Sequence, residues 1–255
     1  MTRTYTRAHR GIFAGLKLLA VAFACGTQGY AQIPGANQAG VNAAMIKLFG
    51  PTTAFSSKAQ VQMLDKAEKE TMSMPMNFAL LDGKIRLEVD LTQLKSKDFP
   101  PQMLGQIKQM GMSQLLTIVR PDKKSTIVIY PALRAYAEMG MSSDEVAALA
   151  SNYKVEKSKL GTENIDGHSC EKNKVTVTDG KGTRQEAVVW NATDLTGFPV
   201  QMRMSQPEAT VVMHFTEIQL ARPDAKQFEP PTGFTKHDSM EKLVQAATLK
   251  MQGGK

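Results

Sequence analysis

Three alternating runs joined by two tight turns constrain the fold of this chain more than any other stretch. The runs cover residues 172–178, 185–191 and 199–204. The turns that separate them are Asp179-Gly180-Lys181-Gly182 and Asp194-Leu195-Thr196-Gly197, and both consist of residue types that favour turns. Because apolar and polar side chains alternate with the period of a β-strand, the stretch predicts an antiparallel meander. Trp190 is its one large apolar anchor.

A second pair of runs surrounds the tight-turn dipeptide Asp82-Gly83 and forms the most regular apolar face in the sequence. Pro75 falls on the other side of the first run, and because proline cannot donate to a ladder, this strand is expected to be an edge or bulged strand. The apolar positions of the two runs form a continuous wall and are our predicted ligand-binding residues: Met72, Met74, Met76, Phe78, Ile85, Leu87, Val89 and Leu91.

The remainder of the chain predicts more strands and a few short helices. Helical spacing or capping signals indicate helices near residues 41–49, 100–110, 142–150 and 238–251. A phase slip in the run 210–220 predicts a β-bulge near Thr216. We therefore expect a mainly β (α+β) fold: one curved antiparallel sheet, or unclosed barrel, of about eleven strands with short helices in its concave face.

The first 31 residues have the three parts of a secretory signal: a basic start, the apolar run 18–24 and small residues before Gln32. Cleavage is expected after Ala31, which predicts a periplasmic or secreted protein. An alternative is a lipoprotein anchored through Cys25. The remaining boundaries are a flexible start with a short helix at 32–53, a β domain at 54–232, and an amphipathic C-terminal helix and tail at 233–255. No segment after the signal is long and apolar enough to be a transmembrane helix.

The positive charge of the chain is partly a property of the signal. The whole chain has 31 Lys and Arg against 24 Asp and Glu. The signal contains four of the basic residues and no acidic ones, which leaves 27 against 24, a net charge of +3. The remaining charges are interspersed, so nucleic acid is not an expected partner.

The sequence contains no catalytic signature, so we expect a protein that is not an enzyme and has no cofactor. Motifs for nucleophile elbows, zinc proteases, phosphate loops and dinucleotides are absent. His168 lies two residues from Cys170, but simple proximity explains this better than a thiol–imidazole pair. The three histidines after the signal lie far apart in sequence, and none has a second ligand at metal-site spacing.

Methionine is the one unusual feature of the composition, with 16 residues in the chain. Spacing of two places both sulfurs of a pair on one face of a strand. The pairs are compatible with an ordinary core, with an adaptable apolar cavity, or with soft-metal (copper) binding by thioethers. The four Met-x-Met pairs are Met72/Met74 (continuing to Met76), Met110/Met112, Met139/Met141 and Met202/Met204.

Several spaced residues occur in an order that resembles a known family. They are Leu160-Gly161-x-Glu163-x-Ile165-x-Gly167-x-x-Cys170, Val189-Trp190, Gly197-Phe198-Pro199-Val200 and Phe228-Glu229-Pro230-Pro231. The chain resembles exported bacterial proteins grouped as a domain of unknown function and similar to the LolA-like superfamily of periplasmic lipoprotein carriers and RseB-type envelope regulators. The resemblance implies an unclosed β-barrel with an apolar concave face, and it supplies no catalytic residues.

Together these observations favour a non-enzymatic exported protein that binds a lipid or lipidated polypeptide as a carrier or envelope sensor. The partners expected on this hypothesis are a lipid or lipoprotein and an envelope protein. The alternatives are copper binding through the Met-x-Met pairs and a protein-interaction scaffold with no small ligand.

Overall fold

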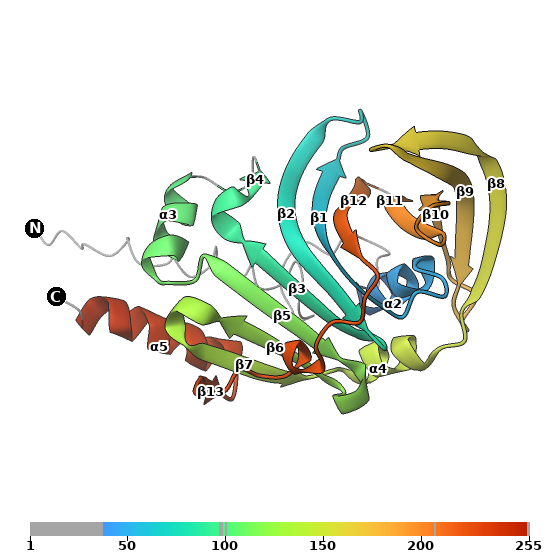
Figure 1. Ribbon diagram of the computed structural model, residues 1–255. Coiled ribbons are helices and arrows are strands. Elements are labelled where there is room, and N and C mark those ends of the chain that lie inside the picture. The colour runs from blue at the N-terminus through green and yellow to red at the C-terminus, as the bar shows by residue number, and fades with distance from the viewer. Residues whose placement is uncertain (1–37, 97–98, 100, 207, 254–255) are drawn as a thin grey trace, which may run out of the picture. The chain divides into compact units, whose positions relative to one another are not determined.

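A thirteen-stranded sheet dominates the part of the chain that the computed structural model describes, residues 38–96, 99, 101–206 and 208–253 (Figure 1). The strand order is β13-β7-β6-β5-β3-β2-β1-β12-β11-β10-β9-β8, with β4 paired to β2. Its ladders are antiparallel except that between β13 and β7, which is parallel. The predicted mainly β architecture is confirmed, with thirteen strands in place of about eleven.

The two short strands account for the larger number. β4 has two residues and β13 has three, which is too short to show an alternating pattern in sequence. The strands are β1 (Ala54–Leu64), β2 (Glu70–Leu81), β3 (Lys84–Asp90), β4 (Lys95–Ser96), β5 (Gln114–Arg120), β6 (Ser125–Tyr130), β7 (Ala135–Gly140), β8 (Lys154–Ile165), β9 (His168–Thr178), β10 (Arg184–Ala192), β11 (Phe198–Ser205), β12 (Thr210–Gln219) and β13 (Thr235–His237).

Short helices connect the strands close to where the sequence predicts them. The α-helices are α2 (Gln38–Leu48), α3 (Pro101–Gln109), α4 (Ser143–Ala150) and α5 (Met240–Gly253). The 3₁₀ helices are η1 (Leu91–Gln93), η2 (Pro121–Lys123), η3 (Pro131–Leu133) and η4 (Ala225–Phe228). Figure 1 shows strands β8 to β12 curling around α2, while α5 packs against β7.

Local sequence signals at three junctions are confirmed. Asp82 and Gly83 have φ angles of 49° and 83°, the left-handed pair that a two-residue hairpin turn needs. Ser142 and Glu145 form a reciprocal capping box at the start of α4. The bulge expected near Thr216 lies one residue later, because Glu217 has a φ of 50° and the pairing of β12 with β1 shifts there.

Of the two alternatives predicted for the strand that contains Pro75, the edge strand is wrong, because β2 lies between β1 and β3. The bulged strand is present, because the pairing of β2 with β1 shifts register between Glu70 and Met72. Pro75 pairs with Gln60 of β1. On its other side, β4 pairs with Met72 and Ser73, and β3 pairs only from Met76 onward. Pro75 therefore falls in a break between two ladders, where a missing N–H group leaves no hydrogen bond unmade.

Five phenylalanines hold α2 against one face of the sheet, which we call the inner face. Phe49, just after α2, lies with its ring centroid 4.8 Å from Phe55 and 5.6 Å from both Phe78 and Phe215. Phe198 lies 5.9 Å from Phe49. All five side chains are at most 2% exposed, so this end of the inner face is a closed aromatic core.

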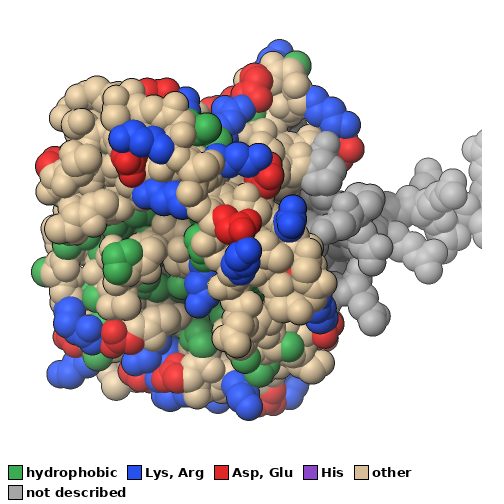
Figure 2. Space-filling view, turned by 90° about the vertical axis from the view of Figure 1, so that its right-hand side faces the viewer, with side chains coloured by type: hydrophobic (Ala, Val, Ile, Leu, Met, Phe, Trp, Pro, Cys, Tyr) green, Lys and Arg blue, Asp and Glu red, His purple; other side chains and the backbone are tan. Residues whose placement is uncertain are grey.

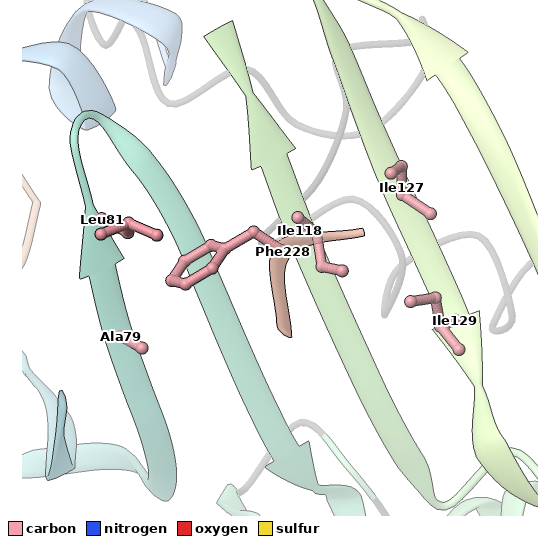
Figure 3. Close-up of a cluster of buried hydrophobic side chains, with 6 residues drawn as sticks. All are labelled: Ala79, Leu81, Ile118, Ile127, Ile129 and Phe228. Carbon is pink, nitrogen blue, oxygen red and sulfur yellow. The ribbon is translucent and has the colours of Figure 1, made fainter. Parts of the chain in front are cut away.

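A second core covers the opposite, outer face. Side chains alternate along β2, so Ala79 and Leu81 point away from Phe78. Figure 3 shows the ring of Phe228, from η4, between these two residues and the isoleucines of β5 and β6. The cluster comprises Ala79, Leu81, Ile118, Ile127, Ile129 and Phe228. Because both faces of this region are covered, all six residues of β6 are buried.

A buried arginine fixes η4 to the sheet. Arg120 is 3% exposed, and its Nη1 donates to the carbonyl oxygen of Phe228 at 2.9 Å. The guanidinium also bonds to Asp122 through Nε and Nη2, at 2.9 and 2.8 Å, and forms an ion pair with Glu229. Each polar end of this buried cation is therefore paired, as burial of a charge requires.

Candidate functional site

The predicted apolar wall of β2 and β3 is present on the inner face. The hairpin register pairs Met76 with Val89 and Phe78 with Leu87. Side chains that are paired across a ladder lie on the same face, so the predicted positions on the two strands meet. Leu91 departs from the prediction, since β3 ends at Asp90 and Leu91 begins the 3₁₀ helix η1, where it is 5% exposed.

The wall continues through β1, which precedes β2 in the chain, and then through β12 and β11, which are distant in sequence. On the β1 side, Met63 pairs with Met72 and Val61 pairs with Met74. The inner face carries seven methionines across β2, β1, β12 and β11, and we call them the methionine belt. They are Met63, Met72, Met74, Met76, Met202, Met204 and Met213. The ligand-binding residues predicted from the sequence did not include Met63, Met202, Met204 and Met213. Met202 and Met204 are two positions apart, which is the spacing that puts both side chains on one face of a strand. Only the order of strands shows that they join the wall.

Burial within the belt changes along the strands. The four methionines nearer the phenylalanine core are closed off, with exposures from 0 to 5%: Met74, Met76, Met202 and Met213. The other three lie toward the opposite ends of their strands and are half-buried: Met63, Met72 and Met204. Val211, which lies between Met63 and Met204, is also half-buried. The inner face is therefore a dry core at the α2 end and accessible at the other end.

Apolar side chains also reach the surface on the side of β8 and β9. Figure 2 shows hydrophobic side chains gathered in a hollow on the side of β8 and β9, with Lys, Arg, Asp and Glu around it. Leu87, in the middle of the predicted wall, is half-buried and not fully covered. The half-buried end of the belt, built from flexible thioether side chains, can adapt to an apolar partner.

Trp190 lies on the outer face, away from the belt. Its neighbour Val189 pairs with Met202 on the inner face, and successive residues of a strand point to opposite sides. Trp190 is 6% exposed, which confirms its role as a buried anchor. Its Nε1 donates to Glu163 Oε2 at 2.7 Å, and Lys172 Nζ lies 5.0 Å from the ring centroid. Lys172, followed by the Trp190 bond, lowers the pKa of Glu163.

His168 and Cys170 do not bond to each other through their side chains. His168 Nδ1 lies 2.7 Å from Asp194 Oδ2, and this contact lowers the pKa of Asp194. Cys170 is 0% exposed, and its thiol donates to the backbone carbonyl of His168. Burial raises the pKa of Cys170, which favours the thiol over the nucleophilic thiolate.

The described residues contain neither a cluster of metal-ligating side chains nor a helix that could cross a membrane. No group of three or more His, Cys, Asp or Glu side chains with metal-site geometry occurs within residues 38–253 as far as they are described. No described helix is both long enough and apolar enough to cross a bilayer. The predicted signal, its cleavage point and Cys25 lie outside the described residues.

A family model described as a domain of unknown function, DUF4412, matches residues 58–196. These residues run from β1 to the turn after β10 and include Met63, Met72, Met74 and Met76 of the belt. The search of curated proteins found no match.

Solved structures with detectable similarity include a lipoprotein and a LolA superfamily protein. The lipoprotein LppX of Mycobacterium tuberculosis is 14% identical, with a TM-score of 0.38 over 74% of this chain and 99% of that one. LprF of Mycobacterium bovis is 11% identical, with a TM-score of 0.40 over 78% and 98%. A LolA superfamily protein of Nitrosomonas europaea is 12% identical, with a TM-score of 0.33 over 75% and 96%. At these TM-scores the similarity carries no argument about what this chain binds.

Proposed function

The chain belongs to the DUF4412 family, and we propose that it is a non-enzymatic, exported protein that binds a hydrophobic ligand on its inner face. The ligand class is a lipid or a lipidated polypeptide, and the role is that of a carrier or an envelope sensor. The binding residues are the methionine belt and the adjoining wall of β3.

The observation that carries this proposal is the burial gradient along the belt. A structural core is covered along its whole length, whereas here Met63, Met72 and Met204 continue a buried apolar face into a half-buried region. An acyl chain placed on these side chains would remove apolar area from water, at about 25 cal/mol per Å². Methionine suits such a contact because its unbranched side chain can repack around partners of different shape.

Binding in preference to catalysis is supported by the state of the most reactive side chains. The thiol of Cys170 is buried and bonded to a backbone carbonyl, and the imidazole of His168 is engaged by Asp194. Neither group lies at the half-buried end of the belt, because Cys170 pairs with Ala192, which in turn pairs with Phe198 of the phenylalanine core.

The ligand-binding proposal is tested at Met72, the half-buried member of the predicted wall. We expect Met72→Asp to fold like the wild type by circular dichroism and to lose binding of a fluorescent fatty acid. A carboxylate covered by an acyl chain must be desolvated, which costs several kcal/mol. Aspartate is preferred to lysine because a long side chain can extend its charge back into water.

Met72→Leu is the matched control, since it keeps the apolar surface, and it should bind the probe like the wild type. Met74 is less suitable for this test because it is 4% exposed, and a charge there would act on folding. A folded Met72→Asp variant that binds the probe with unchanged affinity would refute the assignment of the ligand to this face.

Export is tested separately by sequencing the N-terminus of the protein recovered outside the cytoplasm. Cleavage after Ala31 gives a chain that starts at Gln32. A chain that starts at Cys25 with an added acyl mass would establish the lipoprotein alternative instead.

A further inference from the structure

We propose that the free edge of β8 binds a second copy of this chain. In the dimer, the two β8 strands pair antiparallel across a two-fold axis at Val155. This contact is independent of the proposed ligand binding, because the methionine belt lies on β1, β2, β11 and β12 and includes no residue of β8.

β8 is the last strand at one end of the sheet. It pairs with β9, and no strand of the described part of the chain covers its other edge. All 12 of its residues are exposed or half-buried, whereas the opposite end of the sheet is the three-residue strand β13. Every second residue of an edge strand directs its N–H and C=O groups away from the sheet. β8 therefore presents the backbone groups that a further strand needs.

Symmetry limits how two copies of β8 can pair. The pairing of β8 with β9 shifts between Lys159 and Gly161, so residues 154–159 are the regular part of the strand before this bulge. Side chains that face each other in an antiparallel ladder lie on the same side of the sheet, and side chains alternate along each strand. A two-fold dimer must therefore place one residue of β8 opposite its own copy.

The charges of β8 select Val155 as this central residue. A charged residue at the centre would face its own copy, which excludes Lys154, Glu156, Lys157 and Lys159. A centre at Ser158 would place Lys157 opposite Lys159 of the second copy. A centre at Val155 instead places Lys154 opposite Glu156 of the second copy, and the symmetry produces this favourable contact twice. The lysines thus oppose the other two-fold pairings of the edge.

The side chains at this register are accessible to a second copy. Val155 is 46% exposed although its partner on β9, Val177, is 3% exposed, so a second strand would cover an apolar side chain that the monomer leaves open. Lys154 Nζ lies 2.7 Å from Glu156 Oε1 of the same chain, with side chains 73% and 52% exposed. Because both side chains lie on one side of the strand, each can exchange this partner for its counterpart in the second copy.

The test measures self-association of the exported protein by analytical ultracentrifugation over a range of concentrations. We expect a reversible dimer for the wild type. Lys154→Glu and Glu156→Lys should each weaken it about tenfold, because both symmetric contacts become repulsive. An equimolar mixture of the two variants should recover the association, because opposite charges again face each other at both contacts. Lys66→Glu is the matched control and should dimerise like the wild type, since Lys66 forms a similarly exposed ion pair with Glu208 away from β8.

Cross-linking tests the register itself. Val155→Cys places two thiols opposite each other at the two-fold axis, so a short bismaleimide should join the two chains, while Cys170 is 0% exposed and should not react. Leu249→Cys, at a position 67% exposed on α5, should remain largely monomeric under the same treatment. A wild type that stays monomeric at every concentration would leave the edge to a strand of another protein and would overturn the proposal. A mixture that associates no better than the single variants, or equal cross-linking of the two cysteine variants, would overturn it as well.

Discussion

Replacing Phe49 by alanine tests whether α2 is fixed to the inner face by its aromatic contact. Phe49 is 1% exposed and lies within 4.8–5.9 Å of four other phenylalanine rings. A buried phenylalanine truncated to alanine typically loses about 3–5 kcal/mol, from lost transfer energy and the cavity left behind. Four ring neighbours and near-complete burial predict a loss at the upper end of this range, because several contacts disappear at once.

The loss is measured from urea or thermal unfolding followed by far-ultraviolet circular dichroism. For a domain of this size, about 1 kcal/mol corresponds to about 2–4 °C, so a loss of about 5 kcal/mol should lower Tm by about 10–20 °C. Phe49→Leu refills most of the volume and should cost less than about 1.5 kcal/mol. Leu249→Ala is the control, since Leu249 is 67% exposed and its truncation should leave Tm nearly unchanged. A decrease below about 1 kcal/mol for Phe49→Ala would show that the ring does not hold α2 on the sheet.

Three further predictions concern the outer face and the belt. Arg120 lowers the pKa of Asp122 to about 2, below its ordinary value of 3.8, so this carboxylate contributes stability above about pH 4 that is lost as the pH falls toward 2. The stability difference between wild type and Asp122→Asn in urea unfolding should therefore be larger at pH 6 and decrease as the pH falls through about 2. A difference that does not change with pH would contradict this prediction. Trp190→Ala should lose about 3–5 kcal/mol of unfolding free energy, and a variant that melts like the wild type would mean that Trp190 is not a core residue. Mild peroxide treatment should oxidise the half-buried methionines of the belt first, because access to solvent governs thioether oxidation. Peptide mapping should therefore show methionine sulfoxide at Met63, Met72 and Met204 before Met74, Met202 and Met213. Uniform oxidation of the belt would contradict its burial gradient.

Local physical chemistry determined a large part of this fold. The Asp82-Gly83 hairpin, the Ser142/Glu145 capping box and the bulge beside Thr216 were predicted because each depends on residues within a few positions of one another. Strand alternation likewise predicted which side chains of β2 and β3 share a face, and the hairpin turn set their register.

Contacts between distant strands were decided only by the tertiary structure. Pro75 indicated an edge or bulged strand. β2 can lie in the middle of the sheet because its proline falls in a gap between β4 and β3, which no local signal reveals. The joining of Met63 to Met204 through Val211 depends on β1 pairing with β12, about 150 residues away. Alternation assigns each methionine to a face of its own strand, but the order of strands determines which methionines become neighbours. The sequence therefore determined the apolar wall, and the tertiary structure extended it into a belt with one closed end and one open end.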